Sequence, residues 1–315
     1  MSLRRLWRSR AGRAGLLLVG GLTAVALLAD LLASDLPLLA RVAGQLYVLP
    51  CLTRPAALGD DDNQSLRARL GDGDWALAPP IPYGPESQHP GGTTSILEAP
   101  TCRHFLGTDD RGRDVAARLI HGTRVSLLLG PLAVGLYLLL GLTVGLAAVL
   151  GRPADLILGR VIEVGLTFPT IFLLLAIQGL TARTSLVEVG LAIALTQWPH
   201  VARLTRAEGL RAMSSPHVEA ARALGASPVR IALRHVLPLA AAPALVAAAF
   251  GVAQTILFES ALTFLGFGVP PPLASWGELL SQAQSAHLAW WLLLPATLAL
   301  TLTLSAFTLL GDALS

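Results

Sequence analysis

Long apolar stretches separated by charged residues make up most of the chain. A membrane-spanning helix needs about 20 mostly apolar residues to cross the hydrocarbon core of a bilayer. The spacing of the ionisable residues therefore predicts six spanning helices, at residues 14–33, 125–151, 164–182, 189–202, 236–258 and 288–311. The fourth is the least regular, because its uncharged part is short, must be extended back over residues 186–188 and contains Trp198-Pro199.

The distribution of arginine orients these helices and supports the fourth. With six spans, the N-terminus and the connections 152–163 and 203–235 lie on one side and carry 5, 2 and 6 arginines, whereas the short outer connections hold only Arg183. Because basic residues are enriched on the cytoplasmic side, both termini are expected in the cytoplasm. The first span could also be a cleaved signal peptide ending near Leu32-Ala33-Ser34, but its apolar run is longer than usual for one, which favours a retained anchor.

The composition also indicates a membrane protein. Hydrophobic residues make up 53% of the 315 residues and charged residues 14%, with a mean hydropathy of +0.63, which leaves too few polar side chains to cover a globular surface. All 23 basic residues are arginine. A P-loop needs a lysine, so ATP-driven transport would require an ATPase on another polypeptide. The arginines lie at the ends of apolar stretches rather than in a stripe with aromatic residues, which argues against nucleic-acid binding.

Residues 34–117 differ from the rest in being rich in proline and acidic residues. They predict a long extracytoplasmic loop or a small subdomain after the first helix, which would be a binding surface or partly disordered. Within it, residues 36–49 are apolar enough to lie along the membrane surface, or to pack as a loop segment. Cys51 and Cys102 both fall here, where an oxidising compartment would allow a disulfide, and the alternative is two unpaired residues.

A basic, helix-forming loop interrupts the apolar pattern at residues 203–238. Ser215-Pro216 supplies an N-cap and a first-turn proline, Gly225 can take the left-handed conformation that ends a helix, and Ser227-Pro228 starts a second helix. The loop resembles the cytoplasmic EAA loop of ABC importer permeases, since Glu-Ala-Ala at 219–221 is followed by Gly225 and then by Leu237-Pro238. The alternative is a plain polar connector between two membrane helices.

This resemblance implies that the loop, at about residues 206–238, couples the chain to a groove on an ATPase subunit. The residues that it assigns to this role are His217, Glu219, Ala220, Ala221, Leu224, Gly225 and Pro238. Glu219 would make polar contacts, the two alanines would allow close packing, and Gly225 would set the angle between two short helices. Closure of the ATPase subunits would then move the loop as a rigid lever and switch the pore from inward-facing to outward-facing.

A second resemblance covers most of the chain from residue 103 onward. Residues 106–114, 234–238 and 264–277 are similar to segments of the C-type permease subunits of dipeptide, oligopeptide and nickel importers. The chain departs from that pattern at Leu239, where asparagine is usual, and around His217, near which the pattern usually has an acidic residue. The resemblance implies an all-α integral membrane protein of six transmembrane helices, with the type I ABC importer permease fold.

The same resemblance implies the surroundings of the chain. A B-type permease subunit would complete the pore as a heterodimer in the cytoplasmic (inner) membrane and its lipid, with two ABC ATPase subunits and an extracytoplasmic substrate-binding protein. The substrate would be a di- or oligopeptide, with nickel or another small solute as the alternative. ATP would be bound by the partner subunits, and the chain itself would bind no cofactor. Its permease core would be residues 121–315, after an N-terminal anchor helix and outer loop at residues 1–120.

Three further segments are candidates for a role in transport. Residues 264–272 are too rich in glycine and proline to be helical, which indicates an outer gate or receptor contact, or a simple re-entrant connection. The residues concerned are Phe264, Gly266, Gly268, Pro270 and Trp276. Residues 107–114 predict a capped interfacial helix whose Asp109 or Asp110 faces the N-terminal dipole. Phe168-Pro169 would kink the third span, for gating or for packing alone.

The sequence does not indicate an enzyme or a secondary transporter. No ionisable residue lies in the middle of a predicted span, where proton- or sodium-coupled carriers generally hold acidic groups. The seven histidines are scattered without metal-ligand spacing, and no nucleophile and base are recognisable. Glycine and alanine recur along the second and fifth spans, which predicts close packing of helices.

Overall fold

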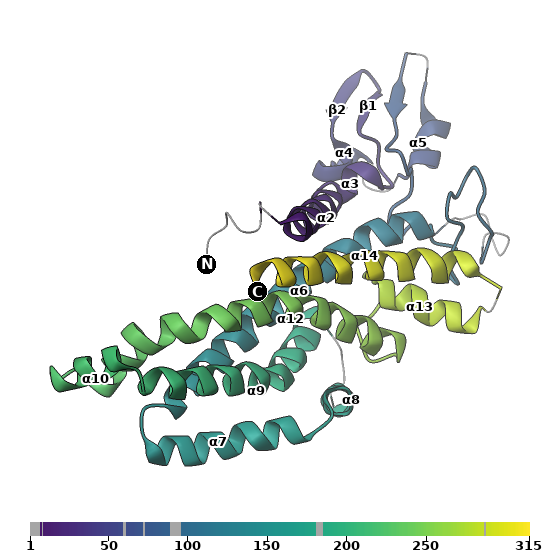
Figure 1. Cartoon of the computed structure of the whole chain (residues 1–315). Coiled ribbons are helices and arrows are strands. Elements are labelled where there is room, and N and C mark those ends of the chain that lie inside the picture. Colours follow the sequence, from purple (N-terminus) through teal and green to yellow (C-terminus); the bar gives the residue numbers. More distant parts are fainter. Residues whose placement is uncertain are drawn as a thin grey trace. The chain divides into compact units, whose positions relative to one another are not determined.

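The computed structural model describes residues 7, 9–58, 61–71, 73–88, 96–180, 185–286 and 288–315, most of them in helices (Figure 1). The chain divides into two compact units. Unit 1 comprises Met1–Leu18, Leu128–Phe258 and Thr303–Ser315, and unit 2 comprises Val19–Leu127 and Glu259–Leu302. Each unit combines segments that are distant in sequence. The sequence analysis divided the chain into two consecutive parts, 1–120 and 121–315. Those parts are not the two compact units, and that division stays a prediction.

Within the described residues, four helical stretches are long and apolar enough to cross a membrane: α2 (Arg10–Leu27), α6 (Val115–Ala148), Pro228–Phe264 and α14 (Trp290–Leu314). The third stretch consists of α11 (Pro228–Ile231), the π-helical turn η3 (Ala232–Val236) and α12 (Leu237–Phe264). The expected fourth span falls within α9 (Leu186–Met213), which is not among these stretches. The count of six spans therefore stays a prediction.

The expected third span is broken. Helices α7 (Arg152–Thr167) and α8 (Thr170–Leu180) are bent by 87° at the Phe168-Pro169 step, and the two together make a fifth candidate span. Phe168 is extended, with φ −83° and ψ 132°, because the helical region is disfavoured for a residue that precedes proline. The bend expected at this step is confirmed.

Close helix packing holds unit 1 together. A Cβ atom on Gly145 of α6 would stand 2.6 Å from Cβ of Thr205 on α9, and one on Gly130 would stand 3.0 Å from Cγ1 of Val252 on α12. Glycine at these two positions lets the helix axes approach, which confirms the expected packing role for Gly130 and Gly145 but not for Gly135, where no atom lies within 4 Å. Arg206 of α9 also donates hydrogen bonds of 2.6 and 3.0 Å to the carboxylate of Asp155 on α7.

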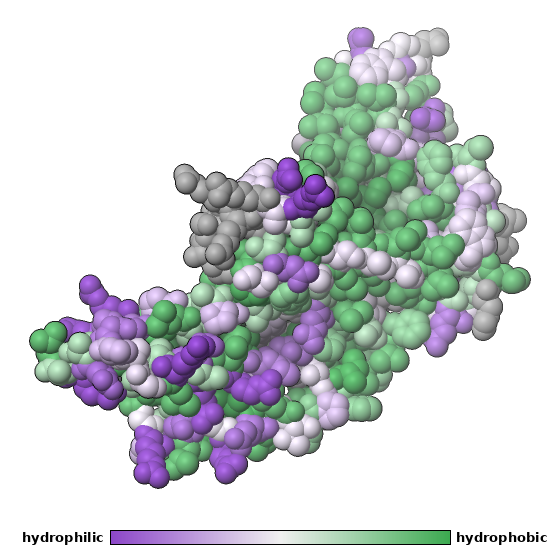
Figure 2. Space-filling model, viewed as in Figure 1, coloured by the Kyte–Doolittle hydropathy of each residue, from purple (hydrophilic) through white to green (hydrophobic). Residues whose placement is uncertain are grey.

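The hydropathy of the surface differs between the long helices and their connections. Figure 2 shows hydrophobic residues over most of the visible surface of the long helices and hydrophilic residues gathered around α7 and α10 (Pro216–Ala223). Leu128, Leu132 and Leu139 on α6 are examples of large apolar side chains that are exposed. This distribution fits helices that face lipid and connections that face water.

Unit 2 contains a small α/β subdomain where the outer loop was expected. β1 (Leu39–Val42) pairs antiparallel with β2 (Gln45–Val48) and β3 (Trp75–Leu77), in the order β2-β1-β3. One face of this sheet packs on a core that includes residues of α4 (Pro50–Thr53), η1 (Ala56–Leu58) and α5 (Asn63–Arg69). The subdomain alternative is therefore confirmed, and most of residues 36–49 form a hairpin within it.

Both cysteines are free in the structure, which agrees with the unpaired alternative and not with a disulfide. Cys51 lies in the subdomain core, packed among apolar side chains such as Leu36 and Leu58, whereas Cys102 is exposed. Burial raises the pKa of the Cys51 thiol, and the negative charge of Asp30 adds to this effect. Cys51 thus acts as a small core residue in this fold.

Two short helices complete unit 2. α3 (Ala29–Leu32) follows α2, and its Asp30 accepts a hydrogen bond of 2.7 Å from Nη2 of Arg124 on α6. α13 (Trp276–Ser285) lies between α12 and α14 in the chain. Its N-cap is Ser275, whose hydroxyl accepts a hydrogen bond from the backbone N–H of Gly277 at 3.1 Å.

Candidate functional site

The segment from Ser215 to Pro238, here called the elbow, consists of α10, a tight break, α11 and the start of α12. Pro216 stands in the first turn of α10, and Ser215 has the extended backbone of an N-cap. The hydroxyl of Ser215 does not cap the helix, contrary to expectation. It donates instead to the carbonyl oxygen of Ala212 at 2.5 Å, so the first turn of α10 is tied back to the end of α9.

The break between α10 and α11 depends on Gly225. Its φ is +80°, in the left-handed region that L-residues with a side chain rarely adopt. This conformation lets the N–H of Ala226 reach the carbonyl oxygen of Ala221 at 3.0 Å, which closes the end of α10. Ser227 then accepts a hydrogen bond from the N–H of Arg230 at 3.4 Å at the start of α11. Two short helices with a break at Gly225 were expected, and this shape is confirmed.

One side of the elbow is anchored in the core of unit 1. Val218 of α10, Ile231 of α11 and Val236 of η3 are buried in a cluster with Leu146 of α6 and Ala212 of α9. Because these side chains interlock with two long helices, the elbow cannot swing independently of them. Sequence reasoning missed Val218, although an apolar residue beside the polar Glu219 is the signal of a helix face turned inward.

The other side of the elbow is exposed. His217, Glu219, Ala220, Gly225 and Pro238 are all exposed, and Ala221 is half-buried. Leu224 is 88% exposed, so nearly its whole side chain is accessible. The exposed side chains of Arg222, Arg230 and Arg234 lie on the same short helices. The structure thus gathers the expected coupling residues on two short helices and their junctions, with an apolar side chain among arginines.

Within the elbow, a π-helical turn joins α11 to α12. η3 covers five residues, Ala232–Val236, and its His235 has a ring centroid 6.1 Å from that of His217 on α10. Such turns occur mostly as single insertions in α-helices and are frequent at functional sites. The sequence reading had expected Leu237-Pro238 as a landmark but had not expected the π-turn before it.

In unit 2, the segment expected to form a capped interfacial helix is a turn. Gly107 and Gly112 have φ of +69° and +73°, and residues 108 and 114 form an isolated antiparallel bridge, which is incompatible with a helix. Asp109 stabilises the turn, because its Oδ1 accepts hydrogen bonds from the N–H groups of Arg111 and Arg113, both at 2.9 Å. The helix that follows is α6, and Asp114 caps it by accepting from the N–H of Ala117 at 2.8 Å.

This turn holds one half of a buried cluster of charges, Asp109, Arg113, Arg118 and Glu278. Arg113 donates to Asp109 at 2.7 Å and to Glu278 at 2.9 Å. Arg118 is fully buried and pairs with the same two carboxylates. With two acids and two bases, each charge has an opposite partner, which offsets the cost of removing them from water. The resembling segment at 106–114 is therefore joined to Glu278, which directly follows the other resembling segment at 264–277.

Other buried groups lie close to these four charged residues. The indole N–H of Trp276 donates to the carbonyl oxygen of Leu119 at 2.9 Å, and the ring lies where a Cβ on Gly122 would stand. His104 Nδ1 lies 2.8 Å from Oδ2 of Asp114, and both side chains are buried. Burial, with the charge of nearby Asp109, raises the pKa of the Asp110 carboxyl. Sequence reasoning missed Arg118 and Glu278. Charged residues at the edge of an apolar stretch could have indicated a buried ion pair.

The residues expected at an outer gate differ in accessibility. Gly266 is exposed with φ +84°, and Phe264 and Pro270 are half-buried. Gly268 is buried against Thr263 so closely that a Cβ atom would overlap the threonine side chain. Trp276 is also buried, which leaves it no surface for contact with another protein. Of these five residues, Phe264, Gly266 and Pro270 remain available for such a contact.

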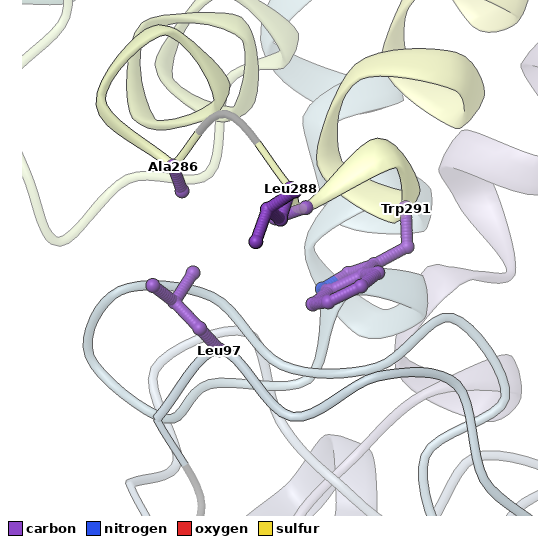
Figure 3. Close-up of a pocket in the computed structure, with 5 residues that line it drawn as sticks. Leu97, Ala286, Leu288 and Trp291 are labelled. Carbon is purple, nitrogen blue, oxygen red and sulfur yellow. The ribbon is translucent and has the colours of Figure 1, made fainter.

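Unit 2 also contains a pocket of about 370 Å³ (Figure 3). Its lining is formed by Leu97, Ala286, Leu288, Ala289 and Trp291. Figure 3 shows the labelled side chains facing a shared space between the loop that carries Leu97 and the connection from α13 to α14. The lining side chains are apolar apart from the indole N–H of Trp291, which is already bonded to the carbonyl oxygen of Thr108 at 3.1 Å. The pocket thus lacks a free polar side chain that would orient a charged substrate.

Within the parts of the chain that the structure describes, no three His, Cys, Asp or Glu side chains are grouped so as to hold a metal ion. The polar clusters described above are instead closed by pairing among themselves. The structure therefore presents two connecting features. In unit 1 the elbow has one buried and one exposed side, and in unit 2 a buried set of charges joins a turn to a short helix.

Comparisons with known proteins give a consistent result. Residues 138–315 match the family model described as "Binding-protein-dependent transport system inner membrane component". A putative peptide transport system permease protein of Brucella suis is 39% identical over 219 residues, which are 69% of this chain and 74% of that protein. The dipeptide transport system permease protein DppC of Alkalihalophilus pseudofirmus is 36% identical over 220 residues, or 69% of this chain and 72% of that protein.

Among solved structures, a chain of the MetNI methionine ABC transporter in an inward-facing conformation matches with a TM-score of 0.52 and 18% identity. The match covers 62% of this chain and 93% of that chain. At this level of identity the likeness concerns the fold alone.

Proposed function

Because this chain belongs to the family of binding-protein-dependent transport system inner membrane components, we propose that it is the permease subunit of an ATP-driven ABC importer that carries di- or oligopeptides across the inner membrane. The relatives named for peptide or dipeptide transport favour peptides over nickel or another small solute. The chain itself is not an enzyme, since it has no lysine for a P-loop and leaves ATP hydrolysis to partner subunits.

The proposed complex contains further subunits. A B-type permease subunit forms the second half of the pore, two ATPase subunits bind ATP, and an extracytoplasmic binding protein delivers the peptide. Both termini of the chain and the elbow face the cytoplasm, which agrees with the arginines that flank the elbow on the inner side. The proposal requires that work done by the ATPases reach the pore through a part of this chain that is both exposed and firmly anchored.

The observation that carries the proposal is the two-sided elbow. Its buried side, with Val218 and Ile231, packs on α6 and α9, while Leu224 on its other side is 88% exposed. An exposed leucine that enters an apolar groove contributes about 1.5–3 kcal/mol. The arginines around it favour a groove with acidic groups at its rim. Movement of the groove is then passed to the long helices, because the anchored side prevents the elbow from slipping.

The test measures binding of the ATPase subunit to the purified permease complex in detergent. Leu224→Ala removes most of the exposed side chain, and we expect about tenfold weaker binding, which corresponds to about 1.4 kcal/mol. Leu180→Ala on α8 is the matched control, because Leu180 is 89% exposed but lies outside the elbow. Equal binding by the two variants, or tight binding by both, would reject the elbow as the docking site.

A second measurement addresses the substrate. The complete complex in proteoliposomes, with its binding protein, should accumulate labelled dipeptides or oligopeptides and should hydrolyse ATP faster when they are present. Nickel ions serve as the competing solute. Uptake of nickel without uptake of any peptide would reject peptides as the substrate class while leaving the ATP-driven permease in place.

A further inference from the structure

The last turns of α12 carry a fully buried carboxyl group, Glu259, which no sequence motif had indicated. Three hydroxyl groups donate hydrogen bonds to it. Ser260 donates to Oε2 at 3.2 Å, and Thr263 and Ser275 donate to Oε1 at 2.9 and 2.8 Å. Among the ion pairs found in the described residues, none involves Glu259, so hydroxyl donors take the place of a cation.

Two of these hydroxyl groups connect Glu259 to the loop 264–275. Thr263 also accepts a hydrogen bond from the backbone N–H of Val269 at 3.2 Å, so its hydroxyl joins the carboxyl group to the middle of the loop. Gly268 fits against Thr263 only because it has no side chain. The loop is therefore folded back onto the end of α12, where the Glu259 carboxyl group accepts the hydrogen bond of the hydroxyl that holds the loop.

The third connection reaches α13. Ser275 donates to Glu259 and, with the same oxygen, accepts from the N–H of Gly277 as the N-cap of α13. A Cβ atom on Gly277 would stand only 2.6 Å from the carbonyl oxygen of Ser260, so the first turn of α13 lies directly on α12. Three residues after Ser275, Glu278 pairs with Arg113 and Arg118. The first turn of α13 is thus fixed from two sides.

We propose that Glu259 is a positioning residue for transport, which acts through Ser275 and Thr263 to make the loop 264–275 and α13 move together with the end of α12. The inference rests on the proposed permease function. α12 starts at Leu237 inside the elbow, so a displacement of the elbow by the ATPases would reach this helix directly. With the hydroxyl bonds in place, displacement of its last turns carries the loop along. Without them, ATP is hydrolysed without a matching movement of the loop.

The first experiment measures hydrogen exchange of the backbone of residues 264–275 in the complete complex. Ser275→Ala removes one donor to Glu259, and we expect about tenfold faster exchange in this segment. Ser275→Thr keeps the hydroxyl group and should restore protection. Ser260→Ala is the matched control, because it removes a hydroxyl bond to the same carboxyl group but none that reaches the loop. Equal exchange in the Ser275→Ala and Ser260→Ala complexes would overturn the proposed arrangement.

The second experiment measures peptide taken up per ATP hydrolysed in proteoliposomes. Ser275→Ala should lower this ratio several-fold and raise ATP hydrolysis without the binding protein, whereas a purely structural role would reduce the amount of complex and leave the ratio unchanged. If Ser275→Ala does not assemble, Thr263→Val tests the same connection with nearly the same shape. A wild-type complex that takes up no peptide overturns the proposed function, and this inference with it. A normal ratio in the variants overturns the role of Glu259 alone.

Discussion

Gly225 allows the elbow to be perturbed without disturbing its neighbours. Its φ of +80° is accessible to glycine, and no atom lies within 4 Å of the place where a Cβ would stand. Substitution by alanine or asparagine therefore adds no steric clash with the rest of the structure. The expected effect comes from the backbone alone, which makes the three variants Gly225→Ala, Gly225→Asn and Gly225→Pro a graded series.

The magnitudes follow from the preferences of each residue. Alanine in the left-handed region costs about 1–2 kcal/mol, which changes the population of the bent elbow by a factor of roughly 5–30. Asparagine visits this region more readily, so its cost should be lower. Proline fixes φ near −65° and has no N–H to replace the hydrogen bond that Gly225 donates to the carbonyl oxygen of Arg222 at 2.9 Å. It should cost about 3 kcal/mol or more.

The assay is peptide-stimulated ATP hydrolysis by the reconstituted complex, measured beside the thermal stability of the permease. Stimulation should fall in the order asparagine, alanine, proline. The melting temperature should fall by about 2–4 °C per kcal/mol of this cost, so ATP hydrolysis is compared at a temperature where every variant is folded. Wild-type stimulation in Gly225→Pro would refute the reasoning, because it would mean that the angle between α10 and α11 does not matter for coupling.

Other substitutions test the remaining sites. Val218→Ala should lower the free energy of unfolding of the permease by about 2 kcal/mol in chemical denaturation, because two buried methyl groups are lost. Val229→Ala is the control, and it should change this free energy by under about 0.5 kcal/mol because Val229 is 55% exposed. Arg118→Met should cost about 3–5 kcal/mol in thermal unfolding, because it leaves two buried carboxylates with one arginine, and a loss below about 1 kcal/mol would contradict the pairing. A maleimide at neutral pH should label Cys102 quickly and Cys51 only after unfolding, because Cys51 is buried and its pKa is raised; equal labelling in the native protein would contradict the subdomain core.

Features that depend on residues close together in sequence could be predicted from the sequence. The membrane class followed from the long apolar stretches, since each must cross a hydrocarbon core of fixed thickness. The break at Phe168-Pro169 and the left-handed turn at Gly225 followed from the backbone preferences of proline and glycine. These preferences act within one or two residues, so they hold in many folds and the structure shows them where they were expected.

Local patterns were misleading where tertiary contacts compete with them. Residues 107–114 contain the polar residues of a helix start, but their carboxylates and guanidinium groups find partners that a helix would not allow. Cys51 was considered for a disulfide because it shares a segment with Cys102, yet the subdomain buries it. In both cases the decision depended on which distant atoms lay nearby, and the identities of adjacent residues do not contain that information.

Apolar length and backbone preference are local properties, so the residues alone were enough to predict a helical membrane protein with an elbow bent at Gly225. The pairing of Arg118 with Glu278 and the bond from Ser275 to Glu259 depend on how the helices pack in three dimensions. The first of these pairs is separated by 160 residues and the second by 16. Such pairs form when the packing of several helices brings them together, since the direction of a side chain across a helix interface is set by the whole interface and not by its neighbours in the chain.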